Sequence, residues 1–149
     1  GRTGALDDAA ANDGFNLVTQ QTAEWNAEKA QQIVQSVIDA GTPFNVIYAE
    51  NDDMAKGAVA ALDKANISHG VGKDVIVMGF DCNKWALEEL KAGNWNYDGQ
   101  CNPFQASYID DIIKKLESGE TISEKTIIMD EKGFDATTIT QEDVDNYGI

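Results

Sequence analysis

Apolar residues recur along this chain at two spacings, and together they predict a regular alternation of helices and strands from residue 3 to residue 118. Apolar positions three and four residues apart indicate amphipathic helices, whereas short apolar runs between turn residues indicate strands. Helices are predicted at residues 2–12, 22–40, 52–65, 83–92 and 103–118. Strands are predicted at residues 15–19, 44–49, 74–80, 95–100 and 126–129.

The strand at residues 74–80 indicates how the predicted sheet is built. Its centre, Val-Ile-Val-Met, is apolar without alternation, which is typical of a parallel strand covered by helices on both faces. The alternation of helix and strand then predicts an α/β fold, a three-layer α/β/α sandwich with a mostly parallel sheet. The more polar strand at residues 95–100 is predicted near an edge, and Thr140 is predicted to cap a final helical turn. A chain of 149 residues with 42% apolar composition fits one such domain.

The residues that follow the predicted strands are candidates for a binding site, because open parallel sheets bind ligands beyond the carboxyl ends of their strands. They comprise an aromatic ring, two amides and a carboxylate, namely Trp25, Asn51, Gln100 and Asp81. Amides and carboxylates hydrogen-bond to adjacent hydroxyls, and an indole covers the apolar C–H face of a sugar ring. These residue types predict a site for a neutral polyol.

Affinity at a single sheet edge is limited, because each hydrogen bond contributes a net ~1 kcal/mol. A second lobe that closes over the ligand and excludes water would supply the remaining contacts. Three of these positions also have a purely structural alternative. Trp25 can be a core residue near a helix start, Asn51 can be only a helix N-cap, and Asp81 can cap the helix that follows Asn83.

Charge and composition narrow the function classes further. The chain has 26 acidic and 11 basic residues, a net charge of −15, and no cluster of Lys and Arg that would favour nucleic acid or an anionic membrane. No apolar run approaches the ~18 residues of a membrane span. The single histidine, His69, is predicted in a solvated loop at the opposite strand end, and no glycine-rich strand-to-helix loop could cradle a phosphate. The sequence therefore predicts no catalytic residue, no metal site and no cofactor.

Two stretches at the predicted strand ends carry a family resemblance. Residues 48–58 read Tyr-Ala-Glu-Asn-Asp-Asp-Met-Ala-Lys-Gly-Ala, and residues 75–81 read Val-Ile-Val-Met-Gly-Phe-Asp. Together they resemble the C-terminal lobe of type I periplasmic sugar-binding proteins, the ribose-, galactose- and galactofuranose-binding components of ABC importers. The resemblance continues through residues 22–26, residues 86–93 and the strand that contains Gln100, so it spans nearly the whole chain.

The resemblance implies roles for individual residues. Asn51, Asp81 and Gln100 match positions at which the family hydrogen-bonds to sugar hydroxyls. Trp25 matches an aromatic residue that packs on the sugar ring, and Phe80 matches a residue that contributes to the same wall. These five residues are the predicted ligand-binding site.

The chain departs from the family pattern in three respects. The family often has an arginine two residues after the packing aromatic, where this chain has Ala27. A further sugar-binding arginine of the family would precede Gly1, and Arg2 is similar to a nearby arginine with a more structural role. The family also has two lobes of similar fold, whereas residues 1–149 resemble the second lobe without the first. We therefore expect half of the cleft to be missing and this lobe alone to bind sugar weakly or undetectably.

The resemblance further implies the setting in which the chain works. It implies a substrate-binding component of an ABC-type importer, not an enzyme, whose partners are a monosaccharide, the missing N-terminal lobe and the importer's permease. It implies no partnership with nucleic acid and no membrane insertion by this domain. The expected location is the periplasm or the extracellular face of the cell membrane, either free or through a lipid anchor.

Two other protein classes share parts of this pattern. The effector-binding domain of LacI-type transcriptional regulators has the same fold and similar Asn-Asp-x-Met-Ala and Gly-Phe-Asp motifs, but regulators usually continue with another acidic residue where Cys82 and Asn83 stand here. A receiver-type phosphoacceptor would use Asp81, but it also needs a lysine that residues 102–104 do not offer. The residues upstream of Gly1 would distinguish transport from regulation, since an export signal indicates the first and a helix-turn-helix the second.

The two cysteines, Cys82 and Cys101, each follow a proposed ligand residue at the ends of strands that should be neighbours. Neighbouring strands lie ~4.8 Å apart, which permits a disulfide at a Cα separation of ~5.5 Å but does not require one. An exported location would favour oxidation. Both a disulfide and two free thiols stay open at this point.

Overall fold

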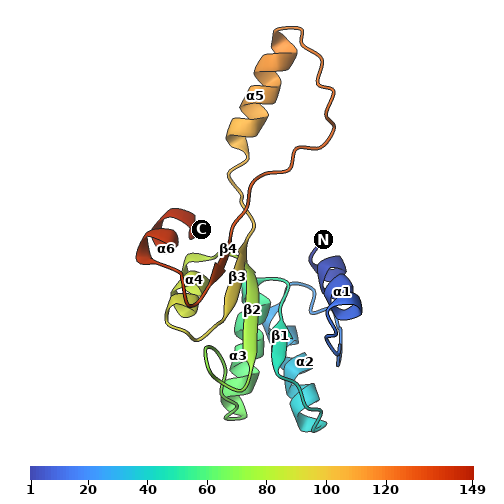
Figure 1. Cartoon of the computed structure of the whole chain (residues 1–149), viewed down its shortest axis with the longest axis vertical. Helices are drawn as coiled ribbons and strands as arrows, with labels where there is room; N and C mark the ends of the chain where they lie inside the picture. Colours follow the sequence, from blue (N-terminus) through green and yellow to red (C-terminus); the bar gives the residue numbers. More distant parts are fainter.

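A computed structural model describes residues 1–149 of the protein, which contain six helices and four strands (Figure 1). The helices are α1 (Arg2–Asn12), α2 (Ala27–Asp39), α3 (Asp52–Lys64), α4 (Lys84–Lys91), α5 (Ala106–Glu117) and α6 (Gln141–Tyr147). The strands are β1 (Val46–Tyr48), β2 (Ile76–Asp81), β3 (Tyr97–Gln100) and β4 (Gly133–Asp135).

The four strands form one sheet in the order β1-β2-β3-β4. β1, β2 and β3 are parallel, with Val46 opposite Ile76 and Asp81 opposite Gln100, while β4 is antiparallel to β3. The helix α3 connects β1 to β2, and α4 connects β2 to β3. The predicted α/β class with a mostly parallel sheet is confirmed.

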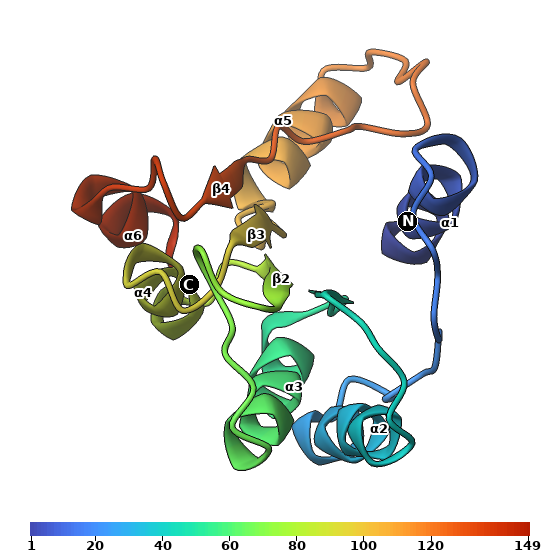
Figure 2. The same cartoon turned by 60° about the horizontal axis from the view of Figure 1, so that its bottom comes forward.

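The two faces of this sheet are covered to different extents. Along β2, Val77 and Gly79 are buried, whereas Ile76, Met78 and Phe80 on the opposite face are exposed or half-buried. Figure 2 shows α3 and α4 on one side of the sheet and α1 on the other side, where only Arg2 at its start contacts β1 and β2. Helical cover on the second face is therefore thinner than the continuous apolar run of β2 predicts.

The hydrophobic core lies between the first face and its helices. Its largest fully buried side chains are Trp95, Leu62, Leu87, Leu90, Val75 and Val77. Gly79 makes this packing possible, because a Cβ at that position would lie 2.7 Å from Cζ3 of Trp95. Gly57 has the same effect between helices, since a Cβ there would collide with the Ala27 carbonyl and separate α3 from α2.

Side-chain caps determine where three of the helices, α2, α3 and α6, begin. The side chain of Asn26 accepts a hydrogen bond from the Lys29 amide at 2.9 Å, so α2 begins at Ala27 rather than at the predicted residue 22. Thr140 and Asp143 form a capping box at the start of α6, which confirms the predicted final turn. No helix combines the length and the apolar character that crossing a bilayer requires.

Three strand predictions were wrong. Residues 15–19 form no strand, because no ladder hydrogen bond pairs them with β1. Residues 126–129 form none either, and the strand of that region is β4, which contributes the buried Phe134. The strand β3 lies between β2 and β4 instead of near an edge. Its polar character comes partly from Asp98, which is fully buried.

An arm formed by residues 101–132 projects from the sheet between β3 and β4 (Figure 1). It carries α5, the helix predicted over residues 103–118. No residue of α5 is buried, although Ile109, Ile113 and Leu116 recur at helical spacing. The apolar face of this helix is therefore open to solvent.

Two leucine substitutions separate the contributions of the core and the arm. Leu62 is fully buried, so Leu62→Ala should lower the free energy of unfolding by about 2–5 kcal/mol. Leu116 is 56% exposed, so Leu116→Ala should change it by less than about 0.5 kcal/mol. Urea unfolding followed by circular dichroism measures both values. Similar losses in the two variants would show that the arm is packed, contrary to this structure.

Candidate functional site

The carboxyl ends of three parallel strands meet at one edge of the sheet, and four of the predicted site residues lie on or just after them. Asn51 follows β1, Phe80 and Asp81 end β2, and Gln100 ends β3. Asp81 and Gln100 stand opposite each other in the ladder. The structure thus brings these four residues together, whereas their contact with a ligand stays a prediction.

Trp25 lies in the turn before α2 and is 63% exposed. The core-packing alternative for this residue is therefore wrong. Both Glu24 and Trp25 have positive φ angles, 52° and 59°, in the left-handed region that bulky residues rarely adopt. Such conformations cost about 1–3 kcal/mol each and cluster at binding sites. Trp25 makes no ring stacking contact with another aromatic side chain, so its indole is open to solvent.

Asn51 has two functional groups that the structure uses differently. Its Oδ1 accepts a hydrogen bond from the Met54 amide at 2.9 Å, which makes Asn51 the N-cap of α3. Its Nδ2 makes no hydrogen bond within the protein and is free to donate. The N-cap alternative is therefore correct for Oδ1 of Asn51, whereas Nδ2 stays available to a ligand at the sheet edge.

Arg2 joins the site from the far end of the sequence. Its Nη2 donates to Oδ1 of Asp81 at 2.8 Å, its Nη1 donates to the Glu50 carbonyl, and its guanidinium lies 5.0 Å from the ring centre of Phe80. The side chains of Arg2 and Asp81 are 24% and 27% exposed, so the pair lies at the rim of the site. Sequence reasoning gave Arg2 a structural role only. The one available signal was that it is the only arginine of the chain, whose planar fork suits a carboxylate.

Phe80 forms an aromatic wall at this edge together with two tyrosines. Its ring packs edge-on against Tyr48, with centroids 5.2 Å apart, and against Tyr97 at 6.5 Å. Gly99, the ladder partner of Phe80, leaves room for the ring, because a Cβ on Gly99 would lie 2.6 Å from Cδ1 of Phe80. The wall is therefore fixed by packing before any ligand arrives.

Gln100 is held by hydrogen bonds to Lys132, the last residue of the arm. Its amide donates to the Lys132 carbonyl at 2.8 Å, and its Oε1 accepts from the Lys132 amide at 3.2 Å. Its Nε2 makes no hydrogen bond within the protein. Gln100 therefore offers a donor held in place by the start of β4.

A strained turn carries Asp81 and Asn83 from β2 into α4. Asp81 and Cys82 have φ angles of 118° and 61°. Asp52 holds the turn, because its Oδ2 accepts from the Asn83 amide at 2.8 Å and from Asn83 Nδ2 at 3.0 Å. The alternative in which Asp81 caps this helix is wrong, since the N-cap residue of α4 is Asn83 and no side chain accepts from the first turn of the helix. The sequence patterns did not reveal this role of Asp52.

Two buried carboxyl groups lie beneath this turn, at Asp52 and Asp98. Burial raises the pKa of Asp52 to about 6. Burial, and next the charge of Asp52, raise the pKa of Asp98 to about 8. Burial also raises the pKa of the Cys82 thiol, whose Sγ donates to Oδ1 of Asp98 at 3.8 Å. Of the two carboxyl groups, Asp98 is therefore the one that retains a proton at neutral pH.

The cysteines and the histidine lie outside the predicted ligand set. Cys82 and Cys101 are free thiols, the first buried and the second exposed, so the disulfide that the sequence left open is not formed. His69 was predicted in a solvated loop, but its side chain is only 13% exposed. Its Nδ1 lies 2.9 Å from the Asn94 carbonyl oxygen and its Nε2 lies 3.1 Å from Oδ1 of Asp63. An isolated bridge from His69 to Val75, the residue before β2, places it near the amino ends of the strands, as predicted.

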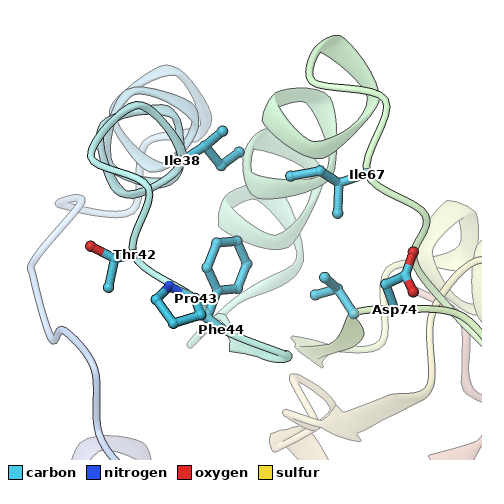
Figure 3. A pocket seen from close by; sticks show the side chains of 7 residues that line it. Ile38, Thr42, Pro43, Phe44, Ile67 and Asp74 are labelled. Carbon is cyan, nitrogen blue, oxygen red and sulfur yellow. The ribbon is translucent and has the colours of Figure 1, made fainter.

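A small groove at the amino ends of the strands is separate from the site (Figure 3). It has a volume of about 200 Å³ and is lined by Ile38, Thr42, Pro43, Phe44, Ile67, Asp74 and Val75. Figure 3 shows Ile38 extending into it from α2 and Ile67 from the loop that follows α3. Its lining is mainly apolar and lacks the amides that a polyol would require.

Comparison with known proteins identifies the family. A family model described as the periplasmic binding protein domain matches residues 2–120. The chain belongs to the periplasmic binding protein family. The fructose import binding protein FruE of Bifidobacterium longum is 31% identical over 146 residues, which cover 97% of this chain and 42% of the relative.

Two further relatives of this periplasmic binding protein domain are also binding proteins. The ribose import binding protein RbsB of Bacillus subtilis is 32% identical over 81 residues, which cover 54% of this chain and 25% of the relative. A solved ABC transporter solute-binding protein from Actinobacillus succinogenes with bound D-allose is 28% identical, with a TM-score of 0.77 over 97% of this chain and 48% of that one. The chain thus spans less than half the length of the relatives it matches. These relatives are binding proteins for sugar import, not enzymes.

The cap at Asn51 predicts a graded effect on stability. Asn51→Ala removes the acceptor for the Met54 amide and should lower the free energy of unfolding by about 0.5–2 kcal/mol. Asn51→Ser retains a side-chain oxygen for the cap and should lose clearly less. Urea unfolding of both variants measures the difference. Equal losses in the alanine and serine variants would show that the cap is not what Asn51 contributes.

Proposed function

We propose that this chain is the C-terminal lobe of the substrate-binding component of an ABC-type importer for simple sugars. In this proposal it holds a monosaccharide in a cleft between two lobes, by hydrogen bonds and aromatic stacking. The observation that carries the proposal is the meeting of free polar groups on Asn51, Asp81 and Gln100 at one sheet edge. The sugar-import names of the relatives support the same ligand class.

The free groups at this edge match the hydrogen-bonding needs of sugar hydroxyls. Nδ2 of Asn51 and Nε2 of Gln100 are donors without a partner in the protein. Arg2 occupies Oδ1 of Asp81 and leaves Oδ2 as a charged acceptor. Hydrogen bonds to a charged group contribute about 1.5–3 kcal/mol each, more than neutral ones.

Aromatic side chains complete the proposed contact surface. The exposed indole of Trp25 can cover the C–H face of a sugar ring. Phe80 contributes an aromatic wall directly before Asp81 in the chain, with Arg2 over its ring. Arg2 therefore joins the proposed set of Trp25, Asn51, Phe80, Asp81 and Gln100, because it fixes the carboxylate that accepts from the ligand.

A second lobe explains the unusual exposure of the chain. The structure exposes 9275 Å², whereas a compact monomer of 16.2 kDa exposes about 7,500 Å². The helices α1 and α5 contain no buried residue. In the proposed protein, an N-terminal lobe packs against the arm of residues 101–132 and encloses the sugar from the other side. Half of the ligand contacts then come from that lobe.

The proposed partners and location are supported by the family and by the import names of the relatives. The closed, sugar-loaded protein delivers its ligand to the permease of the importer, in the periplasm or at the extracellular face of the cell membrane. The protein is either free there or held by a lipid anchor outside this lobe. Transport is favoured over the LacI-type regulatory alternative because the relatives reported above are import binding proteins.

Titration calorimetry against a panel of monosaccharides tests the function. The parent two-lobed protein should bind one of them with micromolar or tighter affinity, and this chain alone should bind it far more weakly because it carries half the cleft. In the parent protein, Asp81→Asn should weaken binding about tenfold or more, since it removes a charged hydrogen bond.

Asp74→Asn is the matched control, because Asp74 is exposed and precedes the amino end of β2. This variant should keep the affinity of the parent protein. An unchanged affinity in Asp81→Asn would argue against the site at the carboxyl edge. Micromolar binding by the 149-residue chain alone would instead refute the claim that half of the cleft is missing.

A further inference from the structure

A pair of fully buried carboxyl groups lies beneath the turn that carries Asp81. We propose that Asp52 and Asp98 share a single proton at neutral pH, and that this pair positions the turn from Asp81 to Asn83 for ligand binding. The consequence for ligand binding rests on the proposed function, whereas the shared proton does not.

Gly79 explains how the two side chains meet. A Cβ on Gly79 would lie 2.7 Å from Oδ1 of Asp52, so the Asp52 carboxyl lies directly over β2 at this position. Asp98 is the ladder partner of Gly79 on β3, and ladder partners project from the same face of a sheet. The absent side chain of Gly79 therefore leaves the space in which the two carboxyl groups approach each other.

One oxygen of each carboxyl group accepts a hydrogen bond, and the other oxygen has no donor. Oδ2 of Asp52 accepts twice from Asn83, and Oδ1 of Asp98 accepts from the Cys82 thiol. Oδ1 of Asp52 and Oδ2 of Asp98 are buried and receive no N–H or O–H donor from the rest of the protein. One proton resolves this, because it turns one carboxyl group into a donor for the other.

The surrounding groups favour this singly protonated state. No ion pair includes Asp52 or Asp98. The titratable groups nearest the pair are the Asp81 carboxylate, the Cys82 thiol and, on the other face of the sheet, the Tyr97 hydroxyl, and none of them is cationic. Burial therefore raises the pKa of both acids without an opposing positive charge.

The pair acts on the site through Asn83. Oδ2 of Asp52 holds both the amide and the side chain of Asn83, and so fixes the strained turn that begins at Asp81. When the shared proton leaves, Asp98 becomes a second buried carboxylate and repels Asp52. Asp98 is therefore a positioning residue, and the turn should loosen as the pH rises through the pKa of Asp98.

The direction of the stability change follows from where the proton binds. The folded protein holds this proton more tightly than the unfolded chain, because the pKa of Asp98 is raised to about 8 on folding. The stabilisation is complete below the ordinary aspartate pKa and is lost as the pH rises to about 8. One extra proton in the folded state raises the unfolding equilibrium constant about tenfold per pH unit within that window.

Carbon-13 NMR titration of the aspartate carboxyl groups in the 149-residue chain tests the proposal. The Asp98 signal should change with a midpoint near pH 8, and the Asn83 amide signal should follow with the same midpoint because it donates to Asp52. Asp98→Asn should remove this step from the Asn83 signal. Asp53→Asn, at the exposed neighbour in α3, should retain it.

Urea unfolding as a function of pH gives a second readout. Between about pH 6.5 and pH 7.5, the unfolding equilibrium constant should rise about tenfold in the unmodified chain and stay nearly constant in Asp98→Asn. An Asp98 midpoint near the ordinary value of ~4, or an unchanged pH slope in the variant, would overturn the shared proton. An Asn83 amide that ignores the titration would overturn the positioning role. Neither readout uses a sugar, so a failure of the proposed function would leave both results unchanged.

Discussion

The hydrogen bonds from Asn83 to the buried carboxylate of Asp52 are the constraint on which the site depends. Asp52 is the first residue of α3, directly after Asn51, and Asn83 lies two residues after Asp81. One carboxylate therefore fixes the polar residues at the ends of β1 and β2 relative to each other. It also compensates for the strained backbone at the end of β2, where the chain must leave the sheet at an angle that regular geometry does not provide.

Burying that carboxylate requires further polar groups in the interior, and the sheet makes room for them. Gly79 leaves space over β2 for the carboxyl of Asp52, and Asp98 stands beside it on β3. On the opposite face, Gly99 leaves space for the Phe80 ring beneath Arg2. The two glycines, one on β2 and one on β3, thus make room for side chains on both faces of the sheet at this edge. The site and the polar interior are two parts of one arrangement.

Sequence periodicity was sufficient to predict α2, α3, α4, α5 and the three parallel strands, because apolar residues recur in each at a regular spacing, even in α5, whose apolar face is open to solvent. The rule for strand ends then correctly placed Asn51 and Asp81 at one edge. Arg2 was underestimated because its contact with Asp81 spans 79 positions and leaves no local pattern. The polar residue Asp98 suggested that β3 lies at a sheet edge. The sequence alone does not reveal that Asp98 is buried next to a second carboxyl group, that of Asp52. Residues 15–19 have strand-forming residue types, but a strand also needs a neighbour to pair with, and no pattern within the segment supplies one.

The central claim is that the carboxyl edge of this sheet is half of a sugar site. Chemical-shift mapping of the 149-residue chain with increasing concentrations of monosaccharide tests it most directly, because weak binding by one lobe still perturbs the residues in contact. The account predicts changes in the Trp25 indole and in the side-chain amides of Asn51 and Gln100. Changes confined to the groove around Ile38 and Phe44, with none at these three side chains, would contradict it.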